Sequence, residues 1–458
     1  MKKWGILLLA ALGGIALVGC QQATTASVSN QQAWLNNTDC TQCHVSRTYA
    51  NFNVNDVLGA KAGYENGGHL NGPRVFVAAS GAGGAREFDG SDANYASGQG
   101  CNKCHTDQGF VDWATNGAPA LTAAGTANTD PNASNTNTGV SLAPPGCFTC
   151  HDPHNKGNMN PRTLATVNLP IGFPTTTTNT STSSVQFTNA AGGNGVLCAN
   201  CHQARTAWAA PTTTYVKIAS YWGPHHGPQT DFFLGVGSAT TATVTTKTAS
   251  YHAGVADTCV GCHMVQPTGN ASSSLQVSGH GMYLTADVHG VPKDFIAVCQ
   301  TCHTVPTATA VTGVKQSAST ASSFVNLVSG STMLFDIQIA EKTLVTYFGL
   351  GANCFTSTGT AAAAGSGAIV AANYDKTVAA PVTADFVPGN SWVQHLDWEF
   401  NPNSPYVSAT QAKALWNFKL FCEDKSLGVH NPEFAAQLLY DAISTLGLTQ
   451  PTNWTARP

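Results

Sequence analysis

The sequence predicts a loop-rich polypeptide with short α-helices and minor β-hairpins, and three observations support this fold class. Only 10% of the 458 residues are charged, while glycine occurs 45 times. Stretches rich in threonine, asparagine, serine and glycine interrupt the apolar periodicity that long helices and strands require. A five-residue motif, Cys-x-x-Cys-His, occurs six times at intervals of about 40 to 60 residues. Segments of that length bury little apolar core of their own.

Each repeat has the spacing of an attachment site for c-type haem. Two thiols three positions apart on a tight turn can each form a thioether to a haem vinyl group, and the next residue then lies under the iron as a neutral imidazole ligand. The twelve cysteines are Cys40, Cys43, Cys101, Cys104, Cys147, Cys150, Cys198, Cys201, Cys259, Cys262, Cys299 and Cys302. The six proximal ligands are His44, His105, His151, His202, His263 and His303. The sequence therefore predicts six covalently bound haem c groups.

Other uses of paired cysteines fit this pattern less well. A zinc site closes with two pairs at short range or with a separated histidine pair, whereas each pair here has its own adjacent histidine. A disulfide scaffold does not require a histidine after every second cysteine. Thioredoxin-like motifs occur singly, next to a βαβ pattern.

The density of the motifs determines what the interior contains. Each haem is served by roughly 70 residues of mature chain, which is less than an ordinary domain. We therefore expect a closely packed haem array that forms the core, with loops and short helices wrapped around it, as in a multihaem cytochrome c. By the logic that couples metal binding to folding, the chain without haem is expected to be largely unfolded.

The first residues predict an export signal at 1–19, in which two lysines precede an apolar run too short for a stable membrane span. The run ends in Leu17-Val18-Gly19-Cys20, which resembles the lipobox of bacterial lipoproteins and implies acylation of Cys20. The alternative is an ordinary cleaved signal with an incidental cysteine. Acyl chains would anchor the protein to a bilayer, and residues 20–38 are polar and small, as in a flexible tether.

The motifs divide the remaining chain into two regions. Residues 39–303 contain all six motifs and are expected to form the hexahaem cytochrome region. Residues 304–458 form a C-terminal region, in which a haem-free insertion without histidine precedes helices that supply a distal ligand. Two cysteines, Cys354 and Cys422, belong to no motif. In an exported protein they either form a disulfide or remain as two buried thiols.

Secondary-structure signals are clearest near the C-terminus. Residues 408–425 have a helical pattern, with a cap at Ser408 or Thr410 and an apolar face that carries Leu415, Trp416, Phe418 and Cys422. Asn431, Pro432 and Gly447 predict the cap, first residue and stop of a second helix, which places His430 just outside a helix start. Residues 324–350 predict a strand and a helix, 211–215 and 239–250 a short strand or hairpin, and 118–141 and 174–195 surface ribbons without helices.

Histidines outnumber the motifs and suggest bis-histidine ligation. Fifteen histidines leave nine after the proximal six, whereas methionine, the rival sixth ligand, is scarce. We expect distal ligands at His69, His154, His226, His252, His280 and His430. His225 is an alternative to His226, His289 is the reserve, and His395 is interpreted as an ordinary packed or surface histidine.

The order of these distal motifs resembles that of large multihaem c-type cytochromes. The motifs are His226-Gly-Pro-Gln, His252 before Cys-Val-Gly-Cys-His-Met, Gly-His280, and Gly-Val-His430-Asn-Pro. Together with the lipobox, the chain resembles the outer-surface lipoprotein cytochromes of metal-reducing bacteria. This resemblance implies an exported outer-membrane lipoprotein, located at the cell surface or at the periplasmic face. It also implies that the protein passes electrons to metal oxides, electrodes, partner cytochromes or an outer-membrane porin–cytochrome complex.

Two classes of function follow. In the first, the protein is an electron conduit that needs no substrate pocket and hence no catalytic residue. In the second, it is a multihaem reductase of a small oxyanion such as nitrite, with one open iron; six intact motifs and sufficient spare histidines argue against this. A subunit of an extracellular cytochrome filament is a further alternative, which a lipid anchor disfavours. The formal charge of −4 becomes about −6 without Lys2 and Lys3, so a nucleic-acid partner is not expected.

Overall fold

The computed structural model describes residues 54–71, 102–105, 107–116, 145–153, 159–170, 184–217, 222–224, 227–239, 250–265, 278–288, 291–294, 298–299, 332–348 and 406–458. The chain divides into two compact units. Unit 1 comprises Met1–Leu164 and His263–Tyr283, and unit 2 comprises Ala165–Cys262 and Leu284–Pro458. Over the described ranges, no helix has both the length and the apolar character needed to cross a membrane.

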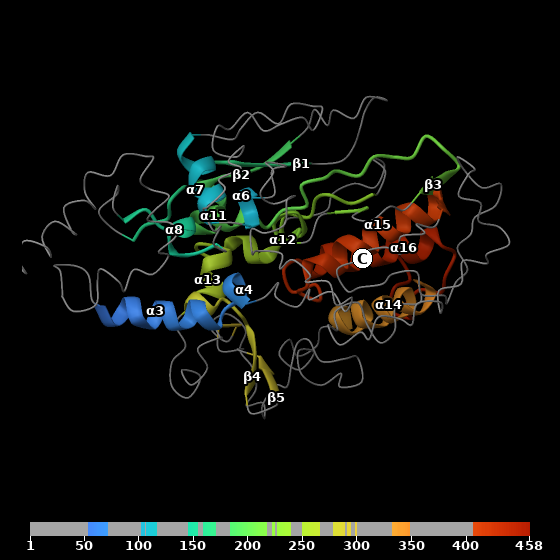
Figure 1. The fold of residues 1–458 in the computed structure, drawn as a ribbon. Helices are drawn as coiled ribbons and strands as arrows, with labels where there is room; N and C mark the ends of the chain where they lie inside the picture. Colours follow the sequence, from blue (N-terminus) through green and yellow to red (C-terminus); the bar gives the residue numbers. More distant parts are fainter. Residues whose placement is uncertain are drawn as a thin grey trace, which may run out of the picture. The chain divides into compact units, whose positions relative to one another are not determined.

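Unit 1 contains short helices (Figure 1). They are α3 (Val54–Asn66), α4 (Gly68–Asn71), α6 (Asn102–His105), α7 (Asp107–Asn116), α8 (Cys147–Cys150) and the 3-10 helix η6 (Gly279–Gly281). The buried carboxylate of Asp107 joins α7 to α8, because its Oδ1 accepts hydrogen bonds from the backbone N–H of Gly146 at 3.2 Å and from the hydroxyl of Thr149. This network fixes the start of the turn that carries the third motif.

The first part of unit 2 contains a small sheet and a chain of short helices. Strands β1 (Val167–Pro170) and β2 (Ser184–Phe187) are antiparallel. They are followed by α10 (Asn189–Gly192), η3 (Gly193–Gly195) and α11 (Val196–Ala199). The strand β2 agrees with the predicted ribbon at 174–195, but the exclusion of helices there was wrong. The hydroxyl of Thr188 accepts a hydrogen bond from the Ala191 N–H, and this cap initiates α10 despite the weak helical composition.

Further short elements of unit 2 follow along the chain. They are α12 (Gln229–Phe233), η4 (Tyr251–Gly254), α13 (Cys259–His263), and the antiparallel hairpin of β4 (Thr285–Val288) and β5 (Val291–Asp294). Strand β3 (Tyr215–Lys217) pairs with β6 (Tyr406–Ser408), with Val216 opposite Val407. A short strand or hairpin was predicted at 211–215, whereas β3 begins only at Tyr215, the last residue of that range. Its partner, β6, is distant in sequence.

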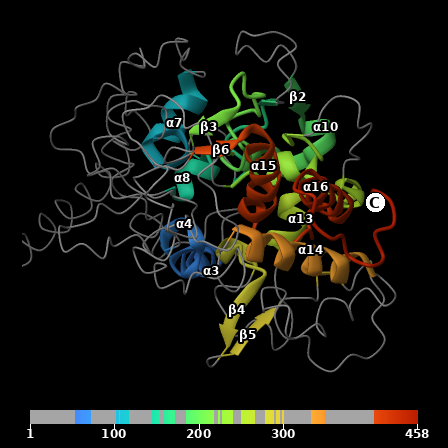
Figure 2. The ribbon, with the colours of Figure 1, turned by 90° about the vertical axis from the view of Figure 1, so that its right-hand side faces the viewer.

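Three long helices complete unit 2: α14 (Thr332–Phe348), α15 (Ala409–Asp424) and α16 (Pro432–Thr445). Both predicted C-terminal helices are confirmed. Ser408 caps α15 by accepting from the Gln411 N–H, and Asn431 caps α16 by accepting from the Phe434 N–H, with Pro432 as first residue. The helix predicted within 324–350 is present as α14. Figures 1 and 2 show α15 and α16 side by side.

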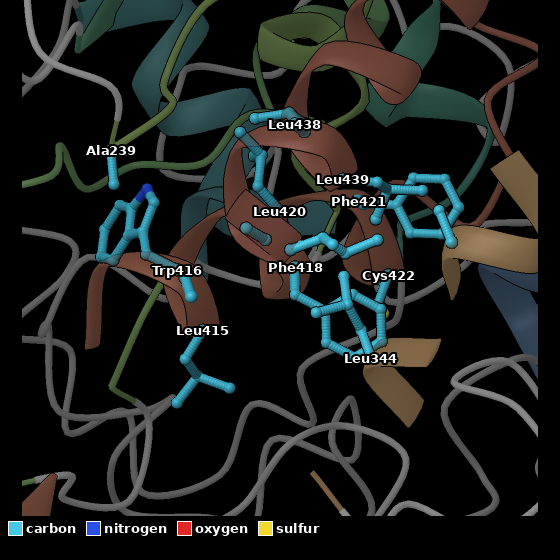
Figure 3. Packing of buried hydrophobic residues seen from close by; sticks show 14 of the residues in the cluster. Ala239, Leu344, Leu415, Trp416, Phe418, Leu420, Phe421, Cys422, Leu438 and Leu439 are labelled. Carbon is cyan, nitrogen blue, oxygen red and sulfur yellow. The ribbon is translucent and has the colours of Figure 1, made fainter. Parts of the chain in front are cut away.

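These three helices share an apolar core that the sequence analysis did not anticipate. Figure 3 shows Leu420 and Phe421 of α15 meeting Leu438 and Leu439 of α16, and all four side chains are fully buried. The indole N–H of Trp416 donates to the Gly237 carbonyl at 2.8 Å, which attaches α15 to the preceding segment. Full burial of one such side chain contributes about 2 kcal/mol, so this cluster stabilises part of unit 2 through protein side chains.

Candidate haem sites

The third, fourth and fifth motifs each form a helical turn. In the third, the N–H of His151 donates to the carbonyl of Cys147 at 2.9 Å, and in the fourth His202 donates to Cys198 at the same distance. The fifth forms α13. This turn brings the two thiols and the imidazole of one motif together. The described motif cysteines form no disulfide and are half-buried: Cys104, Cys147, Cys150, Cys198, Cys201, Cys259, Cys262 and Cys299.

In unit 1, the imidazole of His280 lies next to that of His151. Their ring centroids are 6.2 Å apart, with 43° between the ring planes. A bond from a metal to an imidazole nitrogen is about 2 Å long, and that nitrogen lies about 1 Å from the ring centre, so two imidazoles on opposite sides of one metal have centroids about 6 Å apart. The observed separation therefore fits two axial ligands of one haem iron.

Contacts to the backbone hold the two segments that carry these rings. Arg162 fixes the turn of the third motif, since its Nε donates to the Phe148 carbonyl at 2.5 Å and its Nη2 to the His151 carbonyl at 2.8 Å. His280 lies in η6. The residue after α3, Gly67, approaches η6 so closely that a Cβ on it would lie only 3.0 Å from the Gly281 oxygen. Burial lowers the pKa of both His151 and His280, and their proximity lowers that of His280 further. Both rings are therefore held in the neutral form that binds a metal.

In unit 2, hydrogen bonds connect both His202 and His430 to Asp424, His430 directly and His202 through Gln229. The Nδ1–H of His202 donates to Oε1 of Gln229 at 3.0 Å, and the Nδ1–H of His430 donates to Oδ1 of Asp424 at 2.6 Å. Burial lowers the pKa of His202, the hydrogen bond to Gln229 partly offsets this, and positive charge on His430 lowers it again. His202 nevertheless retains exposed surface.

The pKa of His430 moves in the opposite direction. Burial lowers it, but the charge of Asp424, the hydrogen bond to that carboxylate and the nearby Cys259 thiol raise it by more. A hydrogen bond to an acceptor at Nδ1 places the proton on that nitrogen, so Nε2 carries the lone pair that a metal binds. A metal at His430 therefore has to compete with a proton at Nε2.

Two further histidines have the same Nδ1 arrangement. The Nδ1 of His252, in η4, lies 3.0 Å from the carbonyl of Val429, and the Nδ1 of His263 lies 2.8 Å from the carbonyl of Met282. Each acceptor is a backbone carbonyl, which fixes the tautomer without adding a charge. His252 was expected as a distal ligand and His263 as a proximal one, and their orientation fits both roles.

The fourth and fifth motifs lie next to each other. The thiols of Cys198 and Cys259 share a hydrogen bond, and this bond is the largest of the effects that lower the pKa of Cys259. The charge of His430 contributes to the same shift. Two cysteines from different motifs, each expected to hold its own haem, are therefore in contact, which fits closely spaced haems.

Among the residues that the structure describes, no group of three or more His, Cys, Asp or Glu side chains is arranged to hold a metal ion. The paired histidines require no such group, because a porphyrin supplies four of the ligands to its iron and leaves two axial positions. The described residues thus fit haem c in three respects: motif turns whose thiols form no disulfide, two neighbouring imidazoles, and hydrogen-bond acceptors at Nδ1 of His202, His252, His263 and His430.

Other expected site residues are not brought into a described pair. His69 lies in α4, next to Gly68, whose position is close to Tyr283. Cys104 and His105 lie in α6. Outside the described residues lie Cys20, Cys40, Cys43, His44, Cys101, His154, His225, His226, His289, Cys302, His303, Cys354 and His395.

The hydrogen bonds of Gln229 and Asp424 to the histidines were not predicted from the sequence. A signal for Asp424 was nonetheless present: Glu423 and Asp424 close the predicted helix at its C-terminus, where the helix dipole disfavours negative charge. Such a local conflict is typical of a functional position. For Gln229, the sequence offered only its place after Gly227-Pro228.

Cys422, the buried cysteine of α15, is disulfide-bonded. Because no other described cysteine is disulfide-bonded, its partner lies outside the described residues. This outcome agrees with the expected disulfide and excludes two free thiols; the identity of the partner as Cys354 stays a prediction.

Comparison with known proteins adds no family to this description. No protein-family model matches the chain, no curated protein is significantly similar to it, and no solved structure matches it. The class of protein therefore has to be inferred from the motifs and the geometry of the sites.

Proposed function

We propose that this protein is a multihaem c-type cytochrome that relays electrons along six bis-histidine haems. Its working position is the outer membrane or cell surface, where extracellular metal oxides, electrodes or partner cytochromes accept the electrons. The haem groups supply the redox-active iron, and the polypeptide attaches them, supplies both axial ligands and sets their spacing.

The observation that carries the proposal is the pair formed by His151 and His280. The ring of a proximal histidine defined by its motif lies 6.2 Å, between centroids, from that of an expected distal histidine, and this separation fits a shared iron. An iron closed on both sides by histidine lacks an open position for a small substrate, so this arrangement favours electron transfer over oxyanion reduction.

The spacing of the sites supports a relay. The contact between Cys198 and Cys259 brings the attachment points of two haems together. The lipobox at Cys20 supports attachment to a membrane, from which electrons leave the cell through a partner complex.

Two measurements on the purified mature protein test the proposal. Intact-mass spectrometry should show the added mass of six haems, and low-temperature EPR of the oxidised protein should show six low-spin haems without a high-spin signal. A mass with no haem, or with markedly fewer than six, contradicts the proposal. One stoichiometric high-spin haem would instead favour the reductase.

A further inference from the structure

The last turn of α15 contacts His430 directly and reaches His202 through Gln229. At its end, the Asp424 side chain is completely buried, and Oδ1 accepts the Nδ1–H of His430 at 2.6 Å. Its other oxygen, Oδ2, accepts hydrogen bonds from the backbone N–H of Ser426 at 3.3 Å and from the Ser426 hydroxyl. Both carboxylate oxygens are therefore fixed in position, and one of them is directed at an axial ligand.

Gln229 connects the same turn to His202. Its Nε2 donates to the carbonyls of Glu423 at 3.3 Å and Asp424 at 3.2 Å. These two acceptors fix the orientation of the amide, so its Oε1 has to face Nδ1 of His202, at 3.0 Å. One helix end thus orients the proximal imidazole through a neutral amide and the distal imidazole through a carboxylate.

The acceptors differ in charge. His252 and His263 donate to backbone carbonyls and His202 to an amide, whereas His430 donates to a carboxylate. A charged acceptor draws the Nδ1 proton more strongly and makes Nε2 more basic. A more basic axial ligand stabilises the ferric state relative to the ferrous state, and so lowers the reduction potential.

We propose that Asp424 and Gln229 are positioning residues for the two axial ligands of the haem attached at Cys198 and Cys201, and that the Asp424 carboxylate holds the potential of this haem below the value a neutral acceptor would give. The inference rests on the proposed function, because it requires haem at the fourth motif. Burying this carboxylate at the end of a helix opposes the helix dipole, and the pairing with His430 offsets that cost.

The test is a spectroelectrochemical titration of the haem-loaded protein, combined with EPR. Asp424→Asn keeps an oxygen that can accept from Nδ1 but removes the charge, so one of the six haem components should shift to higher potential while all six stay low-spin. Ser426→Ala removes a donor that competes for the carboxylate, so the same component should shift to lower potential. Gln229→Ala should change the EPR g-values of that component.

A matched control is Asp441→Asn on α16. Asp441 is paired with Arg457 at 2.8 Å, so this variant loses the same charge without removing a histidine partner. It should leave the six potentials in their wild-type order and spacing. Ser426→Ala retains the carboxylate, so it keeps the test decisive if Asp424→Asn fails to bind its full haem complement.

The outcomes separate the two proposals. A wild-type protein without haem contradicts the proposed function. A wild-type protein with six low-spin haems, in which Asp424→Asn and Ser426→Ala leave every component unchanged, contradicts only the role of Asp424. Effects of Asp424→Asn and Gln229→Ala on two different components would show that His430 and His202 do not share an iron.

Discussion

The imidazoles of His151 and His280 are neighbours, with their centroids 6.2 Å apart. The first ring follows a Cys-x-x-Cys turn, and the second lies between two glycines in η6. His280→Ala should therefore convert one haem from low-spin to high-spin, as measured by EPR of the oxidised protein. Added imidazole should restore the low-spin signal by filling the vacated position. An unchanged spectrum would show that another residue occupies the distal position.

His430→Ala should likewise convert one haem, because His430 is inferred to share an iron with His202. The two histidine substitutions act on separate pairs, so the double variant with His280→Ala should contain two high-spin haems. EPR spin quantification measures this sum. A double variant with a single high-spin haem would contradict the assignment of the two histidines to different irons.

Gly67→Ala should loosen the attachment of η6 to α3. The added Cβ would lie 3.0 Å from the Gly281 oxygen and 3.2 Å from its Cα, so one element has to move. We expect a loss of about 1–3 kcal/mol in the free energy of unfolding, together with a weaker His280 ligand signal. Chemical denaturation and EPR measure these effects. Gly254→Ala is the control, because nothing lies within 4 Å of its added Cβ; equal effects of both variants would contradict the packing argument.

Asp231 should make stability depend on pH. Burial raises the pKa of its carboxyl to about 7, although a hydrogen bond from the Ala204 N–H opposes the shift. The unfolded carboxyl ionises near pH 4, so between pH 4 and 7 the folded chain retains a proton that the unfolded chain has lost, and stability falls as pH rises.

Asp231→Asn removes this dependence. Between pH 4 and pH 8, the free energy of unfolding of the variant should rise by up to about 4 kcal/mol relative to that of wild type. Denaturation at each pH measures this difference. Asp441→Asn provides the comparison, since its carboxylate is partly exposed and paired with Arg457. Parallel pH profiles for wild type and Asp231→Asn would contradict the prediction.

Cys422 should be cross-linked to Cys354. The six motifs use twelve cysteines and the lipobox uses Cys20, which leaves these two. Peptide mapping without reduction should recover the linked pair, and Cys422→Ser should lower the free energy of unfolding by about 2–4 kcal/mol. Cys354→Ser should have the same effect, and the double variant should lose no more. A link from Cys422 to a motif cysteine would contradict the count of attached haems.

Features that depend on neighbouring residues were predictable from sequence. The caps Ser408 and Asn431 and the first-turn Pro432 act within a few residues, and the helices begin where these signals lie. The turn of each described motif is local in the same sense. The positive φ of +68° at Gly447 agrees with its predicted role after the second helix.

Relationships across the chain were not predictable. His280 was expected as a ligand, but its spacing from the motifs gives no indication that it lies next to His151. The pairing of β3 with β6 and the contact of Gln229 with Asp424 depend on how distant segments pack. The apolar core of α14, α15 and α16 was missed because high haem density implied that protein side chains would form little core of their own.

The long path from His202 to His430 bears on how the protein would mature if it is exported as proposed. In export that begins at the N-terminus, the thiols of Cys198 and Cys201 would leave the translocation channel well before α15 and α16. A haem attached at once would have one open face until those helices assemble and deliver His430. Formation of the helical core would thus be the step that seals this site, and an exported intermediate would react with small ligands that the finished protein excludes.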